Sequence, residues 1–457
     1  MGDLYGRLCG RPLKKRGHIY ILYYNKEIET MPRHEMEQWQ SLSLSRTVRR
    51  VYANVPLMRR RMDEMKVTPD DIRSIKDIVK LPFTLKTDSR DNYPYGLFAC
   101  DMSEVVRIHT TTGTTGKPTV IGYTQKDIEL WAECVARALA AAGTDKGDIV
   151  HIAYGYGLFT GGLGMHYGAE KLGAIALPTS GGNVTSTERQ ISMMQDFGTA
   201  VLCCTPSYAL YVIDTIEQMG IKLSEIKLKA GIFGAEAWSE DMRLEIERRL
   251  GIKAYNIFGM AEISGPGVAF ECEHRNGMHI NEDHFYPEVI DPDTCEVLPE
   301  GEEGELIFTS ITKEAFPLIR YRTRDITSLS REKCGCGRTF VKMSRLKGRT
   351  DDMLIIRGVN VFPSQIEGVL LSLGHEPHYQ IVVGRVNNLD ILEVQIEMSE
   401  NLFTDNAGDI GKIESQIAGA IANALSVSAK VRLVEPKSIA RSDGKGKVQR
   451  VIDNRKL

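Results

Sequence analysis

The sequence predicts an α/β protein with a large body of several sheets and a small α+β domain at its C-terminal end. Its 457 residues exceed what one hydrophobic core usually serves, so at least two domains are expected. Up to about residue 345, short apolar runs alternate with helical patterns, which is typical of an α/β body with mixed sheets. A charged, glycine-containing segment at 346–352 then separates a shorter region that has its own helices and strands.

The large body is predicted to open with a helix and to continue with buried strands. Apolar side chains recur at helical spacing ahead of Pro56: Leu44, Val48, Val51, Tyr52 and Val55. Four later apolar runs, each bounded by Gly, Pro or Ser, predict strands: 149–153, 174–177, 200–204 and 231–233. Residues 1–23, with the basic cluster Lys14-Lys15-Arg16, are expected to be an extension ahead of the fold.

The C-terminal region repeats this alternation on a smaller scale. We expect a large domain over 24–347, a hinge at 348–352 and a small domain over 353–457. Two stripes at helical spacing predict helices: Ile366, Val369, Leu370 and Leu373, then Ile413, Ile417, Ile421 and Leu425. Three further runs predict strands: 379–383, the strictly alternating 392–398, and a final strand marked by Val431 and Leu433.

Charge and cysteine content narrow the classes of partner. The net charge of -3 provides no sequence-wide basic field, so neither nucleic acid nor an anionic membrane is expected as the main partner. The apolar run at 19–24 is far shorter than a membrane span. Nine cysteines, two of them adjacent at Cys203 and Cys204, do not suggest a disulfide framework. We therefore expect a cytoplasmic protein that binds small molecules.

The strongest local signal is a threonine- and glycine-rich loop between two β-branched runs, 105–108 and 119–123, which predict a buried strand and a second strand. Its glycines let backbone N–H groups approach an anion, its threonines supply donors and its lysine supplies charge. A Walker A loop has four residues between its glycines and Ser or Thr after its lysine, and neither feature is present here. We predict a different phosphate-holding loop: Thr110, Thr111, Thr112, Gly113, Thr114, Thr115, Gly116 and Lys117.

Three further motifs favour a nucleotide site. The first follows the apolar strand that ends at Phe233, where small residues let a planar base approach the backbone: Gly234, Ala235 and Glu236. The second motif is expected to follow another strand, and it consists of Tyr255, Asn256, Phe258, Gly259, Met260 and Ala261. Glu262 comes next and adds a carboxylate able to hold Mg²⁺ beside phosphates. The third is 320–325, whose arginines can face phosphates or a carboxylate and whose Asp325 can accept both hydroxyls of a ribose.

The segment 154–162 places aromatic residues among glycines. Aromatic side chains on such a backbone can wall a flat apolar pocket, and Tyr156 and Phe159 are the candidate ring contacts. From composition alone, a glycine-rich crossing between a strand and a helix has nearly equal weight.

A Cys-x-Cys pair, Cys334 and Cys336, suggests a structural zinc site. Two thiolates on a glycine-rich turn can bind Zn²⁺, but a four-coordinate site needs two more ligands. Cys272 lies upstream, with His274 and His279 close behind it. Free thiols are the alternative, and a zinc-loaded nucleic-acid module is disfavoured by the mildly acidic charge.

Taken in order, these strings resemble the adenylate-forming superfamily of acyl-CoA synthetases, and within it the phenylacetate-CoA ligase family. The resemblance covers nearly everything after about residue 24. It rests on the strings at 111–118, 255–262, 321–325 and 348–363. The last of these, with Gln365-Ile366-Glu367 after it, is highly specific to that family. It implies the adenylate-forming ligase fold, with ATP, Mg²⁺ and coenzyme A as cofactor and co-substrates, and an aryl acid made into its thioester through an acyl-adenylate.

The resemblance also implies roles for the matching residues. The loop 110–117 grips the β- and γ-phosphates, 234–236 line the adenine and acyl pocket, and Glu262 binds Mg²⁺. Asp325 holds the ribose hydroxyls with Arg349 assisting, and Asp351 is the hinge about which the small domain rotates between half-reactions. It favours His279 over His274 as the histidine of the zinc site, and it suggests a homodimer.

The family's adenylation lysine lies near the C-terminus in a Gly-Lys context and stabilises charge developing on the carboxylate and α-phosphate. Two residues fit this context: Lys445 matches through the preceding Arg-Ser, and Lys447 through Gly-Lys-Val-x-Arg, which we favour. Phenylacetate is the expected acid. The alternatives are another aryl acid such as indole-3-acetate, or a binding protein that retains the fold without turnover.

Overall fold

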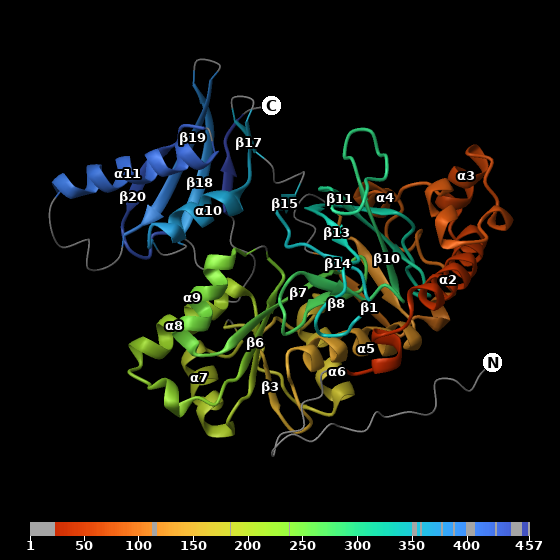
Figure 1. The fold of residues 1–457 in the computed structure, drawn as a ribbon, viewed down its shortest axis with the longest axis horizontal. Coiled ribbons are helices and arrows are strands. Elements are labelled where there is room, and N and C mark those ends of the chain that lie inside the picture. The colour runs from red at the N-terminus through yellow and green to blue at the C-terminus, as the bar shows by residue number, and fades with distance from the viewer. Residues whose placement is uncertain are drawn as a thin grey trace.

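The computed structural model describes residues 23–111, 117–182, 184–236, 238–349, 354–356, 359–375, 378–386, 389–398, 407–425, 427–439 and 450–455. Its mixed α/β body of several sheets, followed by a smaller α+β unit, confirms the predicted fold class (Figure 1).

The α-helices are α1 (Lys26–Glu29), α2 (Arg33–Asn54), α3 (Pro56–Glu64), α4 (Lys86–Asp91), α5 (Gln125–Ala141), α6 (Thr160–Leu172), α7 (Thr187–Phe197), α8 (Pro206–Gln218), α9 (Glu240–Leu250), α10 (Pro363–Ser372) and α11 (Ala407–Leu425). Four short 3₁₀ helices are η1 (Pro69–Asp71), η2 (Ile75–Lys80), η3 (Met102–Glu104) and η4 (Leu223–Glu225). The helix predicted ahead of Pro56 is α2, and the two predicted near the C-terminus are α10 and α11.

The largest sheet has nine strands in the order β13 (Leu329–Ser330), β14 (Lys342–Met343), β9 (Met278–Ile280), β8 (Gly265–Glu271), β7 (Lys253–Met260), β6 (Ala230–Gly234), β5 (Val201–Cys204), β3 (Ile149–Ile152) and β4 (Ile175–Leu177). The run from β4 to β7 is parallel, and β8 pairs antiparallel with β7. Ligands of open parallel sheets bind at the carboxyl ends of such strands, which here end at Gly234 and Met260.

Both faces of this sheet are covered, as the alternation along β5 shows. Val201 and Cys203 belong to one hydrophobic core together with residues of α5 and α6. Leu202 and Cys204 belong to a second core together with residues of α7, α8 and α9. Because successive side chains of a strand point to opposite faces, this strand reads as a continuous apolar run.

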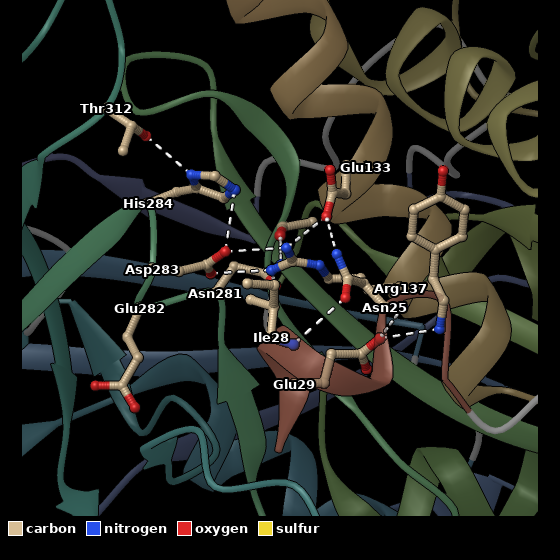
Figure 2. A network of polar contacts seen from close by, with 12 residues as sticks. Asn25, Ile28, Glu29, Glu133, Arg137, Asn281, Glu282, Asp283, His284 and Thr312 are labelled. Carbon is tan, nitrogen blue, oxygen red and sulfur yellow. Dashed lines mark hydrogen bonds and ion pairs between the residues drawn. The ribbon is translucent and has the colours of Figure 1, made fainter. Parts of the chain in front are cut away.

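A second sheet has four antiparallel strands in the order β10 (Phe285–Ile290), β11 (Gly304–Ser310), β12 (Tyr321–Thr327) and β15 (Gly348–Arg349). A buried polar network lies where the chain passes from β9 into this sheet (Figure 2). The guanidinium of Arg137, on α5, donates to Asp283 and to Glu133, and its Nη1 donates to Asn281 at 2.9 Å. The network ties α5 to the link between β9 and β10.

Two short ladders complete the large domain and its boundary: β1 (Arg107–Thr110) with β2 (Val120–Tyr123), and β16 (Leu354–Ile356) with β17 (Val359–Val361). The sequence prediction for β1 was partly wrong. The strand lies at 107–110 rather than 105–108, and it is only partly buried, because Ile108 is 37% exposed whereas His109 is 1% exposed. A β-branched run indicates extended backbone, but it does not show that a covering layer is present.

The small domain has its own sheet and core. The sheet order is β20 (Lys430–Val434), β19 (Leu389–Glu397), β18 (Tyr379–Val386) and β21 (Val451–Asp453). Its core joins strand residues such as Ile381 and Val394 to helix residues such as Ile366 and Ile417. β20 is not the final strand, as the sequence suggested, because β21 follows it and pairs parallel with β18. With three residues, β21 is too short to show a periodic pattern.

The two domains meet through α10 and α9. Figure 1 shows the small domain, in blue, next to α9 and away from α2 and α3. Contacts join α10 to α9, and Leu371 of α10 packs against the core formed by α7, α8 and α9. Within the described ranges, no helix combines the length and apolar character needed to cross a membrane.

Candidate functional site

The described ends of the threonine-glycine loop lie at the end of an antiparallel ladder. Thr110 faces Val120 in the β1–β2 ladder, and the N–H of Thr111 donates to the carbonyl of Thr119 at 3.0 Å. The N–H of Thr119 in turn donates to the Thr111 hydroxyl at 3.0 Å. The ammonium of Lys117 lies 5.0 Å from the ring centre of Tyr93. The central predicted residues lie outside the described ranges: Thr112, Gly113, Thr114, Thr115 and Gly116.

The loop is also joined to the predicted acid-binding segment. The carbonyl of Leu158 accepts from the N–H of Thr110 at 3.1 Å and lies 3.0 Å from Nδ1 of His109. Burial lowers the pKa of His109, so the neutral ring with its proton on Nδ1 is the form that donates to this carbonyl. Sequence reasoning assigned no role to His109, because a single buried histidine has no distinguishing pattern.

The two candidate ring contacts lie at the start of α6. The hydroxyl of Tyr156 lies 3.3 Å from Nδ1 of His166, and burial raises the pKa of this tyrosine. Phe159 is 49% exposed and occupies the position just before the first residue of the helix. A Cβ on Gly162 would lie 2.8 Å from the Tyr156 ring, so this glycine lets the ring pack against the helix. The close approach at Gly162 fits the glycine-rich crossing, and the role of Tyr156 and Phe159 as ring contacts stays a prediction.

Gly234, Ala235 and Glu236 lie at the carboxyl end of β6. A Cβ on Gly234 would lie 2.1 Å from the carbonyl oxygen of Ile257, so only glycine lets β6 and β7 approach this closely. Ala235 has a φ of 72°, a left-handed conformation that turns the chain out of the strand. The Glu236 carboxylate accepts from the N–H of Ser207 at 2.7 Å, in the first turn of α8. Its charge is thus partly used to cap that helix.

The string that begins at Tyr255 lies within β7 and not after a strand, which corrects the sequence prediction. Tyr255, Asn256, Phe258, Gly259 and Met260 are strand residues, and Ala261 and Glu262 form the turn into β8. A Cβ on Gly259 would lie 1.8 Å from the carbonyl oxygen of Gly265, which explains the glycine. Glu262 is 7% exposed. The turn therefore places one carboxylate at the carboxyl end of β7, the strand next to β6 and its loop 234–236.

Asp325 and Arg349 face each other on neighbouring strands. They are register partners of β12 and β15, and the guanidinium donates to the carboxylate at 3.1 Å. The other arginines of the string have structural partners. Arg320 binds Glu288 and Arg322 binds Glu305, so of the two expected partners, phosphates or a carboxylate, both side chains face a carboxylate, in each case one of the protein itself. Asp351 lies outside the described ranges.

One carboxyl of the small domain is buried where the charge of Glu236, at the end of β6, acts on it. Glu367, on α10, is 4% exposed and accepts from the Tyr379 hydroxyl at 3.3 Å. Burial raises its pKa to about 7, since the nearby charge of Glu236 and the loss of water outweigh Arg450, whose guanidinium lies 3.9 Å away. Lys445 and Lys447 lie outside the described ranges.

A group of metal-binding side chains lies apart from these residues. Ligand atoms of Cys272, His279, Cys334 and Cys336 all lie within 4.8 Å of one another, and all four residues are buried. The sulfur atoms of Cys272 and Cys334 are 3.6 Å apart, and Nε2 of His279 lies 3.4 Å from the Cys336 sulfur. His274, the alternative ligand, is not in this group and its side chain is 44% exposed.

The chain matches two family models. The model of the AMP-binding enzyme matches residues 33–312, and that of the AMP-binding enzyme C-terminal domain matches residues 358–455. It is 49% identical to the phenylacetate-coenzyme A ligase of Thermus thermophilus, over 95% of this chain and 100% of that one. With the phenylacetate-coenzyme A ligase of Escherichia coli it shares 50% identity over 94% of this chain and 97% of that one.

Solved structures of a 2-hydroxyisobutyryl-CoA ligase share the fold. Its postadenylation state in complex with 2-HIB-AMP is 30% identical and gives a TM-score of 0.89, covering 97% of this chain and 94% of that one. The structure of its thioesterification state, with 2-HIB-AMP and CoA, is 31% identical in sequence and gives a TM-score of 0.70. It covers 95% of this chain and 92% of that one. At nearly equal coverage, the higher score indicates a domain arrangement like that of the postadenylation state. The chain belongs to the phenylacetate-CoA ligase family of AMP-binding enzymes.

Proposed function

We propose that this chain joins phenylacetate to coenzyme A at the expense of ATP. The observation that carries the proposal is the sequence identity of 49% and 50% with two phenylacetate-coenzyme A ligases, along nearly the whole length of both chains. In the first step, a carboxylate oxygen of the acid attacks the α-phosphorus of ATP and diphosphate leaves. In the second, the thiol sulfur of CoA attacks the acyl carbon, AMP leaves and the thiol loses its proton.

The described residues support this assignment of roles. The hairpin ends at Thr110, Thr111 and Lys117 hold the loop that grips the phosphates, and the end of β6 with Tyr255 on β7 receives adenine. The Asp325–Arg349 pair receives the ribose hydroxyls, because a carboxylate accepts both of them and the guanidinium holds the carboxylate in place. Leu158, held by both His109 and Thr110, keeps the acid-binding segment next to the phosphate loop.

Glu262 fits a magnesium ligand. It offers a hard oxygen donor of the kind that Mg²⁺ prefers, on a turn at the carboxyl end of β7. When bound, the ion neutralises charge on the ATP phosphates. Glu262 acts by holding it there.

Rotation of the small domain about Asp351 in the 348–352 hinge belongs to the proposal, as do the domain limits 24–347 and 353–457. The rotation serves two steps at different atoms, because diphosphate leaves from the α-phosphorus of ATP whereas the thiol attacks the acyl carbon of the adenylate. Lys445 or Lys447, with preference for Lys447, stabilises the charge of the adenylation step. Glu367 is buried within reach of the charge of Glu236, and this marks where the small domain lies against the large one in this structure.

We also propose that the cysteine cluster holds a structural zinc ion. Three thiols and one imidazole with ligand atoms within 4.8 Å of one another suit a tetrahedral site with no open position. Such an ion would join the turn carrying Cys334 and Cys336 to the end of β8 and to β9. A cytoplasmic homodimer is proposed from the family resemblance alone.

Two alternatives remain for the function. A related ligase could act on indole-3-acetate or another aryl acid, since a change of one ring in an apolar pocket alters binding by only a few kcal/mol. A binding protein without turnover could keep the fold. The pairing of Asp325 with Arg349 and the tight glycine geometry at β6 and β7 favour an intact nucleotide site.

Diphosphate–ATP exchange tests the function directly. Exchange in the presence of Mg²⁺ is expected to depend on phenylacetate and to be lost in a Lys445→Ala/Lys447→Ala double variant. The single variants then identify the lysine that acts. A panel of aryl acids ranks the substrates, and absence of exchange with every acid in the panel would reject the ligase assignment.

A further inference from the structure

Lys313 is a buried cation that none of the assigned roles uses. It follows β11, it is 2% exposed, and its ammonium donates to the carbonyl of Ile263 at 3.0 Å. The ammonium lies 4.4 Å from the ring centre of Tyr123 and 5.6 Å from that of Phe316. A charge in this position loses its water, so it persists only where carbonyl, ring and carboxylate groups compensate for that loss.

The carbonyl that Lys313 binds belongs to the residue directly after Glu262. The hydroxyl of Tyr123 donates to the next carbonyl along, that of Ser264, at 3.3 Å. Two donors therefore hold successive carbonyls of the turn between β7 and β8. Tyr123 is also the last residue of β2, the strand that leaves the phosphate loop. Lys313 and Tyr123 thus connect the turn that carries Glu262 to the strand that carries the loop.

The backbone around Lys313 is itself held on both sides. On one side, the Asp127 carboxylate accepts from the N–H groups of Glu314 and Ala315 at 2.7 and 2.9 Å. On the other, the hydroxyl of Thr312 lies 2.9 Å from Nδ1 of His284, at the edge of the buried network that Figure 2 shows. Hydrogen bonds on both sides of Lys313 therefore hold the backbone from which its side chain extends.

The charges of two carboxylates act on this ammonium: Asp127 at the start of α5 and Glu262 on the turn. Burial lowers the pKa of Lys313 to about 8, against the effect of these two charges. The positive form thus predominates at neutral pH, and it keeps its hydrogen bond to the turn.

We propose that Lys313 is a positioning residue for the Mg·ATP half of the site, which sets the place of Glu262 by holding the Ile263 carbonyl. The inference rests on the proposed function in assigning Mg·ATP to this half. In this role Lys313 acts through the backbone of the turn. Its removal frees the turn, so the carboxylate loses its place relative to the phosphate loop, whereas the acid-binding segment at 154–162 keeps its own contacts.

The test compares Lys313→Met with wild type, by titrating ATP at several Mg²⁺ concentrations and by steady-state kinetics. Methionine preserves length and apolar packing but has no donor and no charge. We expect the KM for Mg·ATP and the Mg²⁺ concentration for half-maximal rate to rise about tenfold or more, as for loss of a hydrogen bond from a charged group. The KM for phenylacetate should stay within about twofold.

Two further variants separate positioning from folding. Tyr123→Phe keeps the ring but removes the second donor, so it should show the same selective change at smaller size. Lys313→Arg keeps charge and donor, and should recover most of the Mg·ATP affinity. Arg249→Met is the matched control: it removes a mostly buried cation from α9 whose partners are Asp214 and Glu217, and should leave both KM values unchanged.

The proposal is overturned if folded Lys313→Met binds Mg·ATP as wild type does, or if the KM values for both substrates rise together. If Lys313→Met does not fold, Tyr123→Phe decides: an unchanged Mg²⁺ dependence rejects the proposal. ATP binding needs no turnover, so a wild-type chain without exchange activity would reject the ligase function while these titrations still decide the role of Lys313.

Discussion

The guanidinium of Arg349 donates to the carboxylate of Asp325 at 3.1 Å, and the two residues are register partners of the last two strands of the second sheet. The Asp325 side chain is 5% exposed and that of Arg349 is 30% exposed. Arg349 is also the second residue of the proposed 348–352 hinge. The proposed ribose contact and the proposed hinge are therefore joined by one ion pair, so that rearrangement at the hinge acts directly on the carboxylate proposed to hold the nucleotide.

Replacing Arg349 by Ala is expected to weaken ATP use selectively. The carboxylate loses a charge-assisted hydrogen bond worth about 1.5–3 kcal/mol, which corresponds to a fall of about 10–100-fold in kcat/KM for ATP. Initial rates at varied ATP measure this. Arg324→Ala is the control, because that side chain is 39% exposed and lies 3.5 Å from Glu305. Equal losses in the two variants would mean that position 349 has no special link to the nucleotide.

The sequence predicted the helices and strands, but not which of their charged side chains form ion pairs within the protein. Strand and helix periods located β5, β19 and α11, because their apolar spacing follows from burial alone. The arginines of 320–324 looked free to bind phosphate, yet Arg320 is paired with Glu288 from a strand 32 positions away. Such pairings depend on register between distant strands, which a linear pattern does not encode.

The same limit applies to the residues around the site. The cysteine group could be proposed from spacing, since Cys-x-Cys is a local signal. Spacing did not separate His279 from His274; the family resemblance favoured His279, and the structure places it, on β9 next to β14, with the cysteines. His109 and Lys313 have no local signal at all. Each matters through a backbone carbonyl of another segment, Leu158 and Ile263, and only the fold brings these together.

Gly259→Ala is expected to damage the nucleotide site through the backbone. The new methyl group would lie 1.8 Å from the Gly265 carbonyl oxygen and 2.7 Å from Cα of Pro266, so β7 and β8 must separate next to Glu262. A loss of at least about 2 kcal/mol in unfolding free energy is expected, together with weaker ATP binding. Gly419→Ala on α11 is the control, with open space around it, and should stabilise the chain by about 0.5–1 kcal/mol.

Urea unfolding and ATP titration of both glycine variants measure these effects. If Gly259→Ala matches wild type in stability and ATP affinity, the close approach of β7 and β8 does not constrain the site.

The cysteine cluster predicts one zinc ion per chain. Cys336→Ser should remove the ion and lower the unfolding free energy by about 2–5 kcal/mol, because the four buried ligands then lack the bonds that hold their segments together. Elemental analysis and thermal unfolding measure the two effects. Cys100→Ser is the control, since Cys100 is only partly buried and lies outside the cluster. Wild-type protein prepared without chelator and found to contain no zinc would end the proposal.

Glu367 predicts a pH dependence of stability with a definite sign. Its pKa is raised from an ordinary value of 4.5 to about 7, first by burial and also by the charge of Glu236. Between these pH values the folded chain holds a proton that the unfolded chain has lost. This carboxyl therefore makes stability fall as pH rises through that window, with no penalty below about 4.5 and the full penalty above about 7.

Glu367→Gln removes the penalty, because the amide fills the same space and cannot ionise. The variant should gain on wild type by on the order of 3 kcal/mol between pH 4.5 and 7, measured by urea unfolding at a series of pH values. Glu393→Gln, on β19, is the control with the opposite sense: hydrogen bonds from Gln395 and Lys430 lower the pKa of Glu393, so its carboxylate favours folding as pH rises. If the unfolding free energies of wild type and Glu367→Gln change with pH in parallel, Arg450 keeps the carboxylate ionised. The small domain then lies against the loop 234–236 without taking up a proton.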